Sequence, residues 1–373
     1  MGRQKKQNIA AIRVDSSEEM GSGHLMRCLT LAERLRSEGW QVHFICRDLL
    51  GNLTHLIEEK GFFLHFLSRK ETHAILSNYE AWLTVPVEED VQETTAILRE
   101  MAEDVGEVSR LIIDHYAIDA RWEIIVRPFV KEIFVIDDLA NRAHDCDYLL
   151  DQTFSKNMMH RYDGLVPKQC QLLLGPKYVL LRSEFYEARK SLRKRDGTLR
   201  RILVFYGGSD STGETEKAMR ALFLLDLKDV TIDVVVGGSN TRKAEIKKKC
   251  ESHPSFHYYC QVNYMAELMA RADLALGAGG TATWERCFLG LPAIVTAIAE
   301  NQFPACHSCA EAGLIYYAGT WREVSSEALR DLVLKFREQR ELKAFQTSCW
   351  LEHAFEAVEK WETGTGKRLG TGR

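Results

Sequence analysis

The chain has 373 residues, enough for two domains of ordinary size, and its 45% hydrophobic and 27% charged residues are typical of a globular protein. Its net charge of −4 offers no basic field for nucleic acid or an anionic membrane. Because no apolar run approaches the roughly 20 residues of a membrane span, we expect a cytoplasmic protein with neither nucleic-acid nor membrane partners.

The first half alternates short β-rich runs with helical patterns. The runs are nearly continuous in apolar residues, as in strands buried on both faces of a parallel sheet. They cover residues 9–14, 41–47, 62–67, 110–116 and 132–137. Between the first two runs, apolar residues recur at helical spacing from Leu25 to Leu35, and Gly39 closes that helix. This βαβ order predicts a doubly wound sheet.

A charged segment, residues 182–200, interrupts the rhythm, and we interpret it as a linker. The strand pattern then restarts. The second set of runs covers residues 201–210, 230–240, 256–262, 273–280 and 292–300. The sequence therefore predicts an α/β protein with two Rossmann-like domains. Their predicted bounds are residues 1–181 and 201–345, with a C-terminal amphipathic helix and a flexible glycine-rich tail in residues 346–373.

Ten cysteines are scattered singly along the chain. Most lie in apolar patterns, where a free thiol behaves as a small hydrophobe. Cys306 and Cys309 form a lone CxxC with no partner pair, which argues against a zinc site or a redox motif. We therefore expect a reducing compartment and a protein without metal or cofactor.

Two doubly wound domains in tandem place the carboxyl ends of both sheets along one cleft, where ligands of such sheets bind. The first loop at such an end is "MGSGHLMR", in which Gly21 and Gly23 permit close approach of a ligand and His24 falls in the first helical turn. Because Met26 stands where a dinucleotide fingerprint needs its third glycine, we reject a nicotinamide site.

The position of His24 leaves two interpretations open. The helix macrodipole opposes a positive charge at a helix N-terminus, so we expect a neutral imidazole there. A neutral imidazole accepts a proton, which makes His24 a candidate general base. The alternative is a histidine that only caps the helix.

Two further glycine-rich loops follow strands of the second half. Gly207, Gly208 and Ser209 offer backbone and hydroxyl donors to a phosphate, although a plain βα turn has the same pattern. The loop of Gly279, Gly280 and Thr281 precedes a helix and is suited to a diphosphate. Glu285, in that helix, can accept hydrogen bonds from both hydroxyls of a ribose. The alternative is a capping threonine with a salt-bridged glutamate.

Polar residues also end two other strands. Tyr116 follows a strand of the first half in "DHY", and Asn301 and Gln302 follow a strand of the second half in "AENQ". Asn301 and Gln302 are placed to hydrogen-bond a sugar or a phosphate. Each of the three is individually more typical of a loop residue with a local role.

With these residues identified, the chain resembles the UDP-sugar hydrolases of pseudaminic acid biosynthesis, which release UDP from UDP-2,4-diacetamido-2,4,6-trideoxy-β-L-altropyranose. It is similar also to the spore coat polysaccharide biosynthesis proteins. The resemblance covers nearly the whole chain and rests on motifs from "IRVDSSEEMGSGHLMRCLTLA" to "GAGGTATWERCFLGLP". It departs at Thr153, where we expect asparagine, and at the basic start and the glycine-rich tail, which extend beyond the family core.

The resemblance implies a glycosyltransferase-B fold, close to the MurG-like transferases, and a hydrolase that inverts the anomeric carbon. It implies that His24 is the base that activates water, with Tyr116 and Asn301 near the sugar and the attacking water. It also implies that Glu285 binds the ribose and that Met265 frames the uracil. The residues assigned to substrate binding are Arg13, Asp15, Gly21, Gly23, Gly207, Gly208, Ser209, Met265, Gly279, Gly280, Thr281, Glu285 and Gln302.

Two other functions use the same sites. A MurG-like inverting glycosyltransferase with a UDP-sugar donor would use His24 to deprotonate an acceptor hydroxyl, and a binding protein would need no base at all. Asp137 and Asp138 are adjacent rather than spaced as an Asp-x-Asp metal motif, so we expect no metal. We expect a monomer, because both domains face one cleft.

Overall fold

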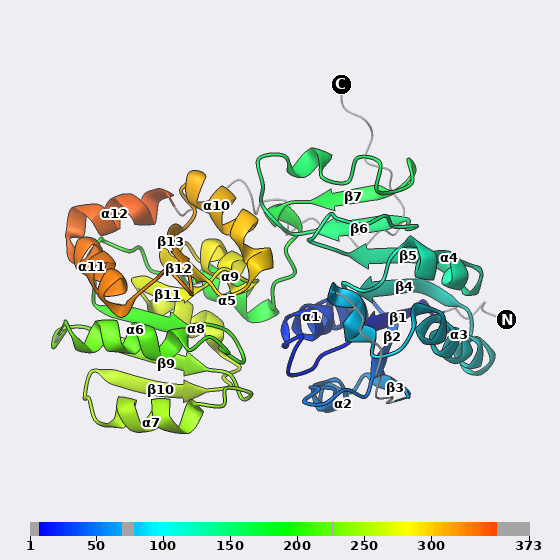
Figure 1. Cartoon of the computed structure of the whole chain (residues 1–373), viewed down its shortest axis with the longest axis horizontal. Coiled ribbons are helices and arrows are strands. Elements are labelled where there is room, and N and C mark those ends of the chain that lie inside the picture. Colours follow the sequence, from blue (N-terminus) through cyan, green and yellow to red (C-terminus); the bar gives the residue numbers. More distant parts are fainter. Residues whose placement is uncertain (1–6, 69–77, 226, 349–373) are drawn as a thin grey trace.

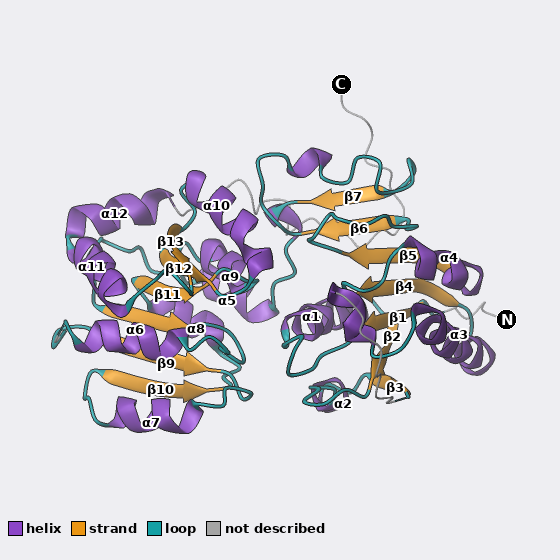
Figure 2. Ribbon diagram, in the orientation of Figure 1, coloured by secondary structure: helices purple, strands orange, loops and turns teal. Residues whose placement is uncertain are grey.

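A computed structural model describes residues 7–68, 78–225 and 227–348 of the chain. It contains two parallel sheets, each covered by helices on both faces (Figures 1 and 2). The first has seven strands in the order β3-β2-β1-β4-β5-β6-β7, and the second has six in the order β10-β9-β8-β11-β12-β13. The predicted fold class, two doubly wound domains, is confirmed.

The first domain contains all seven strands of the first sheet. The strands are β1 (Ile9–Val14), β2 (Gln41–Arg47), β3 (Phe63–Leu67), β4 (Val108–Asp114), β5 (Val130–Ile136), β6 (Tyr148–Asp151) and β7 (Gln171–Leu174). The helices are α1 (Gly23–Ser37), α2 (His55–Glu59), α3 (Val87–Asp104) and α4 (Ala120–Val126), with 3-10 turns η1 (Asn78–Leu83), η2 (Arg127–Phe129), η3 (Met158–His160) and η4 (Pro176–Tyr178).

The second domain repeats the architecture with a second core. Its strands are β8 (Arg201–Phe205), β9 (Thr231–Val236), β10 (Phe256–Cys260), β11 (Leu274–Ala278), β12 (Ala293–Ala297) and β13 (Tyr316–Thr320). Its helices are α5 (Ser183–Lys190), α6 (Glu214–Phe223), α7 (Lys243–Glu251), α8 (Met265–Arg271), α9 (Ala282–Phe288), α10 (Phe303–Glu311), α11 (Ser326–Arg337) and α12 (Gln339–Ser348), with the 3-10 turn η5 (Glu300–Gln302).

Helix α1 forms as its apolar spacing predicts. Its buried face, which includes Leu25, Leu29 and Leu35, packs in one core cluster with residues of β1 and β2. The helix ends at Ser37, and the positive φ of 88° at Gly39 lets the chain turn back while Trp40 N–H donates to the Leu35 carbonyl at 3.0 Å. This packing fixes the start of α1, and with it His24, against the sheet.

The segment predicted as a linker contains helix α5. Phe185 of α5 is buried in a core cluster with residues of α8 and α9. Arg195, further along, donates to backbone carbonyls that include those of Ala272 and Leu289, both at 2.8 Å. The segment predicted as a linker, residues 182–200, is therefore largely docked on the second domain.

The C-terminal helix predicted over 346–362 falls mainly outside the described residues. Residues 346–348 form the end of α12, and the rest of that prediction, with the glycine-rich tail, lies in the part of the chain that the structure does not describe. In the described ranges, none of the helices has both the length and the apolar character needed to cross a bilayer.

Candidate active site

The glycine-rich loop before α1 meets the second domain directly. Helix α1 lies on the side of the first domain that faces the second (Figure 1). A Cβ atom placed on Gly208 would lie 3.0 Å from the Ser22 hydroxyl, so the two glycine-rich loops touch across the domain boundary. The two loops, which were predicted to meet at one cleft, therefore contact each other directly.

His24 is held by a buried carboxylate. Its Nδ1 lies 2.6 Å from Oδ1 of Asp114, the last residue of β4. An ionised carboxylate can only accept, so Nδ1 carries the proton and Nε2 presents its lone pair. Among the described residues, Nε2 has no hydrogen-bond partner. An imidazole oriented in this way is prepared to take a proton at Nε2.

Arg27, one helical turn after His24, fixes the carboxylate in turn. Its Nε and Nη2 donate to the two oxygens of Asp114 at 2.5 and 2.6 Å, and Nη1 donates to Asp138 at 2.9 Å. Burial alone would raise the pKa of Asp114. The charges of Arg27 and His24 and their hydrogen bonds lower it by more than burial raises it, so the pKa lies well below its ordinary value. Asp114 is therefore ionised at neutral pH.

Tyr116, predicted to lie near the sugar and the attacking water, packs against His24 with ring centroids 4.5 Å apart in an edge-on arrangement. Its hydroxyl donates to Asp138 at 2.5 Å, and its ring stacks on Trp82 at 5.5 Å. Burial and the charge of Asp138 raise the pKa of Tyr116 well above its usual range. The phenol therefore stays protonated and forms part of the wall around the histidine.

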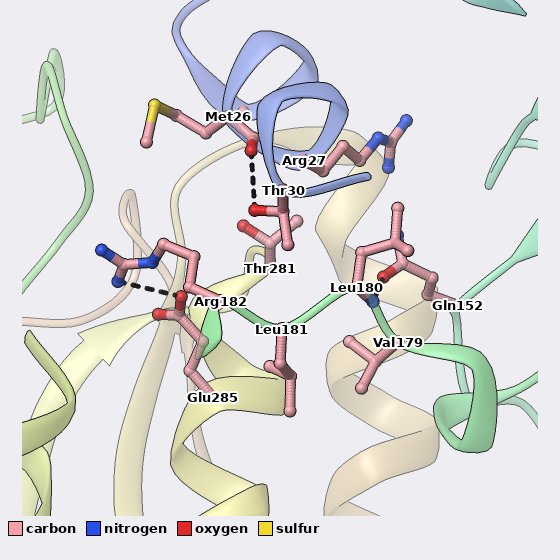
Figure 3. A pocket seen from close by; sticks show the side chains of 11 residues that line it. Met26, Arg27, Thr30, Gln152, Val179, Leu180, Leu181, Arg182, Thr281 and Glu285 are labelled. Atoms are coloured by element: carbon pink, nitrogen blue, oxygen red, sulfur yellow. Dashed lines mark hydrogen bonds and ion pairs between the residues drawn. The ribbon is translucent and has the colours of Figure 1, made fainter. Parts of the chain in front are cut away.

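A pocket opens between α1 and the second domain (Figure 3). Its lining residues are Gly23, Met26, Arg27, Thr30, Gln152, Val179, Leu180, Leu181, Arg182, Thr281 and Glu285. Figure 3 shows Glu285 facing Arg182 on one side, with Met26 and Thr30 of α1 on the other. The pocket thus joins the helix that begins with His24 to the residue predicted to bind the ribose.

Glu285 has a cation beside it. Nη2 of Arg182 lies 3.3 Å from Oε1 of Glu285, and Nη1 of the same arginine pairs with Glu184 at 2.6 Å. The predicted alternative of a salt-bridged glutamate is therefore present. The carboxylate still lines the pocket, and its Oε2 has no hydrogen-bond partner among the described residues, so it retains an acceptor for a ligand.

Both glycine-rich loops of the second domain expose backbone donors. In the described part of the chain, the N–H groups of Gly207, Gly208 and Ser209, and those of Gly279, Gly280 and Thr281, donate to no protein acceptor. Asp210 caps α6 by accepting from the N–H groups of Glu214 and Thr215, both at 2.9 Å. These loops can therefore offer amide donors to an anion.

The structure divides the predicted pair Asn301 and Gln302. Asn301 is exposed. Burial, and then the charge of Asp138, raise the pKa of Tyr79 in the first domain. The charge of Glu300, the neighbour of Asn301, is close enough to raise it as well. Tyr79 in turn contacts Tyr116 at 4.9 Å. The side-chain oxygen Oε1 of Gln302 already accepts from the backbone N–H of Ile298 at 3.0 Å. The side-chain nitrogen Nε2 is therefore the group left for a ligand.

Arg13, Asp15 and Met265, which were predicted to bind the substrate, are buried. Arg13 is completely buried and pairs with Asp15 at 2.6 Å and with Asp90 at 2.7 Å. Its guanidinium and the Asp15 carboxylate are thus enclosed in the first domain and contact no open surface in this conformation. Met265 is 4% exposed within the core of the second domain, which leaves its side chain little surface for a base.

Sequence reasoning missed Asp114, Arg27, Asp138 and Trp82. Asp114 stands in the quoted "DHY", directly after a strand, and Arg27 is one helical turn from His24, so both had a positional signal. Trp82 comes from η1, far along the chain from its partners, and had none. Within the described ranges, no cluster of three or more His, Cys, Asp or Glu side chains could hold a metal ion.

The sequence is similar to curated proteins over most of its length. It is 26% identical over 322 residues to spore coat polysaccharide biosynthesis protein SpsG of Bacillus subtilis, covering 85% of this chain and 86% of that one. It is 26% identical over 264 residues to UDP-2,4-diacetamido-2,4,6-trideoxy-β-L-altropyranose hydrolase of Campylobacter jejuni, covering 70% and 81%. No protein-family model matches the chain.

A third relative is longer. It is an uncharacterised protein of Methanocaldococcus jannaschii, 26% identical over 291 residues that cover 76% of this chain, which spans 54% of the relative's length. Among solved structures, MurG of Acinetobacter baumannii superposes with a TM-score of 0.63 at 13% identity, over 95% of this chain and 97% of that one. A UDP-glucosyltransferase of Polygonum tinctorium gives 0.64 at 12% identity, with the same coverages.

This chain has the glycosyltransferase-B fold. The resemblance seen in the sequence, to the spore coat proteins and the diacetamido-sugar hydrolase, is confirmed by these relatives, and the two-domain structure has the fold of MurG. The glycine-rich loop that precedes His24 meets the second domain, at Gly208 and at the pocket lined by Gly23 and Thr281.

Proposed function

We propose that this glycosyltransferase-B protein is a hydrolase that releases UDP from a UDP-linked 2,4-diacetamido-2,4,6-trideoxyhexose. The observation that carries the proposal is the pairing of His24 Nδ1 with Asp114, which leaves Nε2 without a partner among the described residues, two residues after the Ser22 that contacts the second domain. The name of the Campylobacter jejuni relative supports this substrate class, and that of the Bacillus subtilis relative supports a role in coat sugar synthesis.

In the proposed reaction, water attacks the anomeric carbon opposite the diphosphate. Nε2 of His24 takes a proton from the water, and Asp114 stabilises the imidazolium that forms. The bond from the anomeric carbon to the β-phosphate oxygen breaks, and UDP leaves. One displacement gives one inversion. Backbone amides of the two glycine-rich loops of the second domain receive the negative charge of the departing diphosphate, without metal or cofactor.

The remaining site residues have supporting roles in this proposal. Glu285 accepts from the ribose hydroxyls, and Arg182 keeps its carboxylate at the pocket until a nucleotide binds. Tyr116 closes one side of the histidine, and Asn301 faces the sugar from the second domain. We propose that the enzyme acts in the cytoplasm as a monomer.

A second candidate function is supported by the fold itself, which the chain shares with MurG. In a glycosyltransferase, Nε2 of His24 deprotonates an acceptor hydroxyl instead of water. The same pocket, loops and carboxylate then serve the UDP-sugar donor. The two functions therefore differ only in the nucleophile.

One assay separates the two. Purified protein is incubated with UDP-2,4-diacetamido-2,4,6-trideoxyhexoses and, as a control, UDP-N-acetylglucosamine, with EDTA and no acceptor, while UDP release is followed. We expect enzymic release of UDP, its loss in His24→Ala with UDP binding retained, and ¹⁸O from labelled water in the free sugar. Release that requires an added acceptor would establish the transferase, and ¹⁸O in the phosphate would exclude attack at carbon.

A further inference from the structure

Arg286 differs from every other buried arginine of the described chain. The five arginines that are less than a tenth exposed are Arg13, Arg27, Arg47, Arg110 and Arg286. The first four each form an ion pair with a carboxylate, at 2.5 to 2.7 Å. Within the residues that the structure describes, Arg286 forms none. It is 2% exposed, so its charge is also largely shielded from water.

The partners that Arg286 does have are neutral. Nη2 donates to the Ala278 carbonyl at 2.7 Å and to the Thr283 hydroxyl at 3.0 Å, while Nε is buried without a partner. The adjacent carboxylate, Glu285, pairs with Arg182 instead. Burial lowers the pKa of Arg286, and the nearby Cys287 and Glu285 offset this only in part. A buried charge without a counter-ion is costly to a fold, so its retention calls for a function.

The position of Arg286 indicates that function. Ala278 ends β11, and Gly279, Gly280 and Thr281 follow it directly. In a trans peptide the carbonyl of one residue and the N–H of the next point in opposite directions. The bond from Arg286 to the Ala278 carbonyl therefore turns the Gly279 N–H away from the guanidinium. A Cβ on Gly277 would lie 2.7 Å from Nη1 of Arg286, so the cation lies tightly against the strand end that leads into this loop.

We propose that Arg286 is the positioning residue of a diphosphate site, with the ligand's diphosphate as the missing counter-ion of its buried charge. It holds the loop of residues 279–281 with its amides free, and it makes the potential at those amides positive. It acts through the loop and does not touch the substrate. This inference rests on the proposed function and extends it, because it explains how a diphosphate leaving group is neutralised from beneath the loop.

The test compares ligands that share a nucleoside and differ in charge. Binding of uridine, UMP and UDP is measured by calorimetry for the wild-type protein, Arg286→Met and Arg195→Met. Arg195 is a matched control, because its guanidinium also donates to backbone carbonyls of the second domain but lies away from the loop. We expect Arg286→Met to bind UDP roughly ten- to a hundredfold more weakly, UMP less so, and uridine within about twofold of wild type. Arg195→Met should keep the wild-type ratios.

The outcomes separate this inference from the proposed function. If the wild-type protein does not bind UDP, both fail. If it binds UDP but Arg286→Met weakens UDP and uridine equally, Arg286 only supports the fold and this inference alone is overturned. Should Arg286→Met not fold, Arg286→Lys decides, because it keeps the charge. We expect it to retain most of the preference for UDP over uridine, and loss of that preference would overturn the inference.

Discussion

The two domains share one architecture but present different chemistry where they meet. The first domain contributes side chains, above all His24 and its partner Asp114, which are held by a short buried ion-pair network. The second contributes main chain, the free amides of residues 207–209 and 279–281, with the unpaired cation of Arg286 beneath one of them. One domain is thus equipped to move a proton and the other to receive an anion.

This difference teaches that the same doubly wound scaffold can hold either half of a displacement reaction. Side chains are suited to proton transfer, because their basicity is set by their partners. Backbone amides do not titrate, so they bind an anion equally well over a wide pH range. Substitutions in the first domain should therefore change mainly the rate, and those in the second mainly the affinity for the nucleotide.

The strongest test of this division is Asp114→Asn. An amide in place of the carboxylate no longer fixes the proton on Nδ1 or stabilises the imidazolium, so we expect UDP release to slow by about 10³- to 10⁴-fold. The affinity for UDP, measured by calorimetry, should stay unchanged. Asp163→Asn, which removes an exposed carboxylate of the same domain, is the control and should keep full activity. A loss of UDP affinity as large as the loss of rate would contradict the division.

Glu285→Gln addresses the other half. A carboxylate that accepts from ribose hydroxyls contributes to the binding of every uridine nucleotide, so we expect UDP and uridine to bind about ten- to a hundredfold more weakly. The rate at saturating substrate should fall far less. Glu267→Gln, on the exposed side of neighbouring α8, serves as the matched control. If uridine binding were unchanged, Glu285 would not be at the ribose.

Gly23→Ala tests whether the first loop lacks a side chain at this position because the substrate occupies that space. A Cβ on Gly23 would meet nothing within 4 Å, and Gly23 lines the pocket. We expect thermal stability to be retained and kcat/KM to fall about tenfold, because the methyl group enters space that the substrate needs. Gly39→Ala is the contrast. At its φ of 88° the methyl should cost about 1 kcal/mol of stability and leave turnover unchanged.

The pH dependence of stability should also differ between the domains. The buried histidines His24, His43, His115 and His144 belong to the first domain, whereas the described histidines of the second are exposed. Burial, and then the nearby His65, lowers the pKa of His43 from 6.5 to about 4. Between these pH values His43 binds a proton in the unfolded chain but not in the folded domain, so the free energy of unfolding falls as the pH falls.

Hydrogen exchange followed by mass spectrometry can measure this effect domain by domain. Between pH 6.5 and 4, we expect His43 to reduce the opening free energy of the first domain by at most about 1.4 kcal/mol per pH unit. His43→Gln should remove that share of the slope, and His257→Gln, an exposed position in the second domain, should not. An equal acid sensitivity of both domains would contradict the comparison.

Much of the fold was predictable, because a parallel strand buried on both faces leaves a nearly continuous apolar run. All ten predicted strands are present, with ends that differ by a few residues. The sequence did not reveal β6 and β7, which have only four residues each, or β13, whose short run YYAGT is half-buried throughout. In so short a run, apolar periodicity does not differ from that of a loop.

The site was predictable only in part, because its parts are joined by sheet order and not by sequence. His24 could be found from its glycine-rich loop after a strand. Asp114 lies 90 residues later and meets it because β4 pairs with β1. Arg13 shows the reverse case, since a charged residue in a strand next to the loop is enclosed by Asp15 and Asp90. The assignments of Asn301, the monomeric state and the cytoplasmic location stay predictions.

The contact between Gly208 and Ser22 leaves little space between the two domains at this point. With no side chain on Gly208, the loops already approach to the point where a single added carbon would lie 3.0 Å from the Ser22 hydroxyl. A larger residue than glycine at position 208 would therefore press against Ser22. Alanine, serine and valine at this position would place side chains of increasing size between the two loops. We expect the distance between the loops to increase in that order.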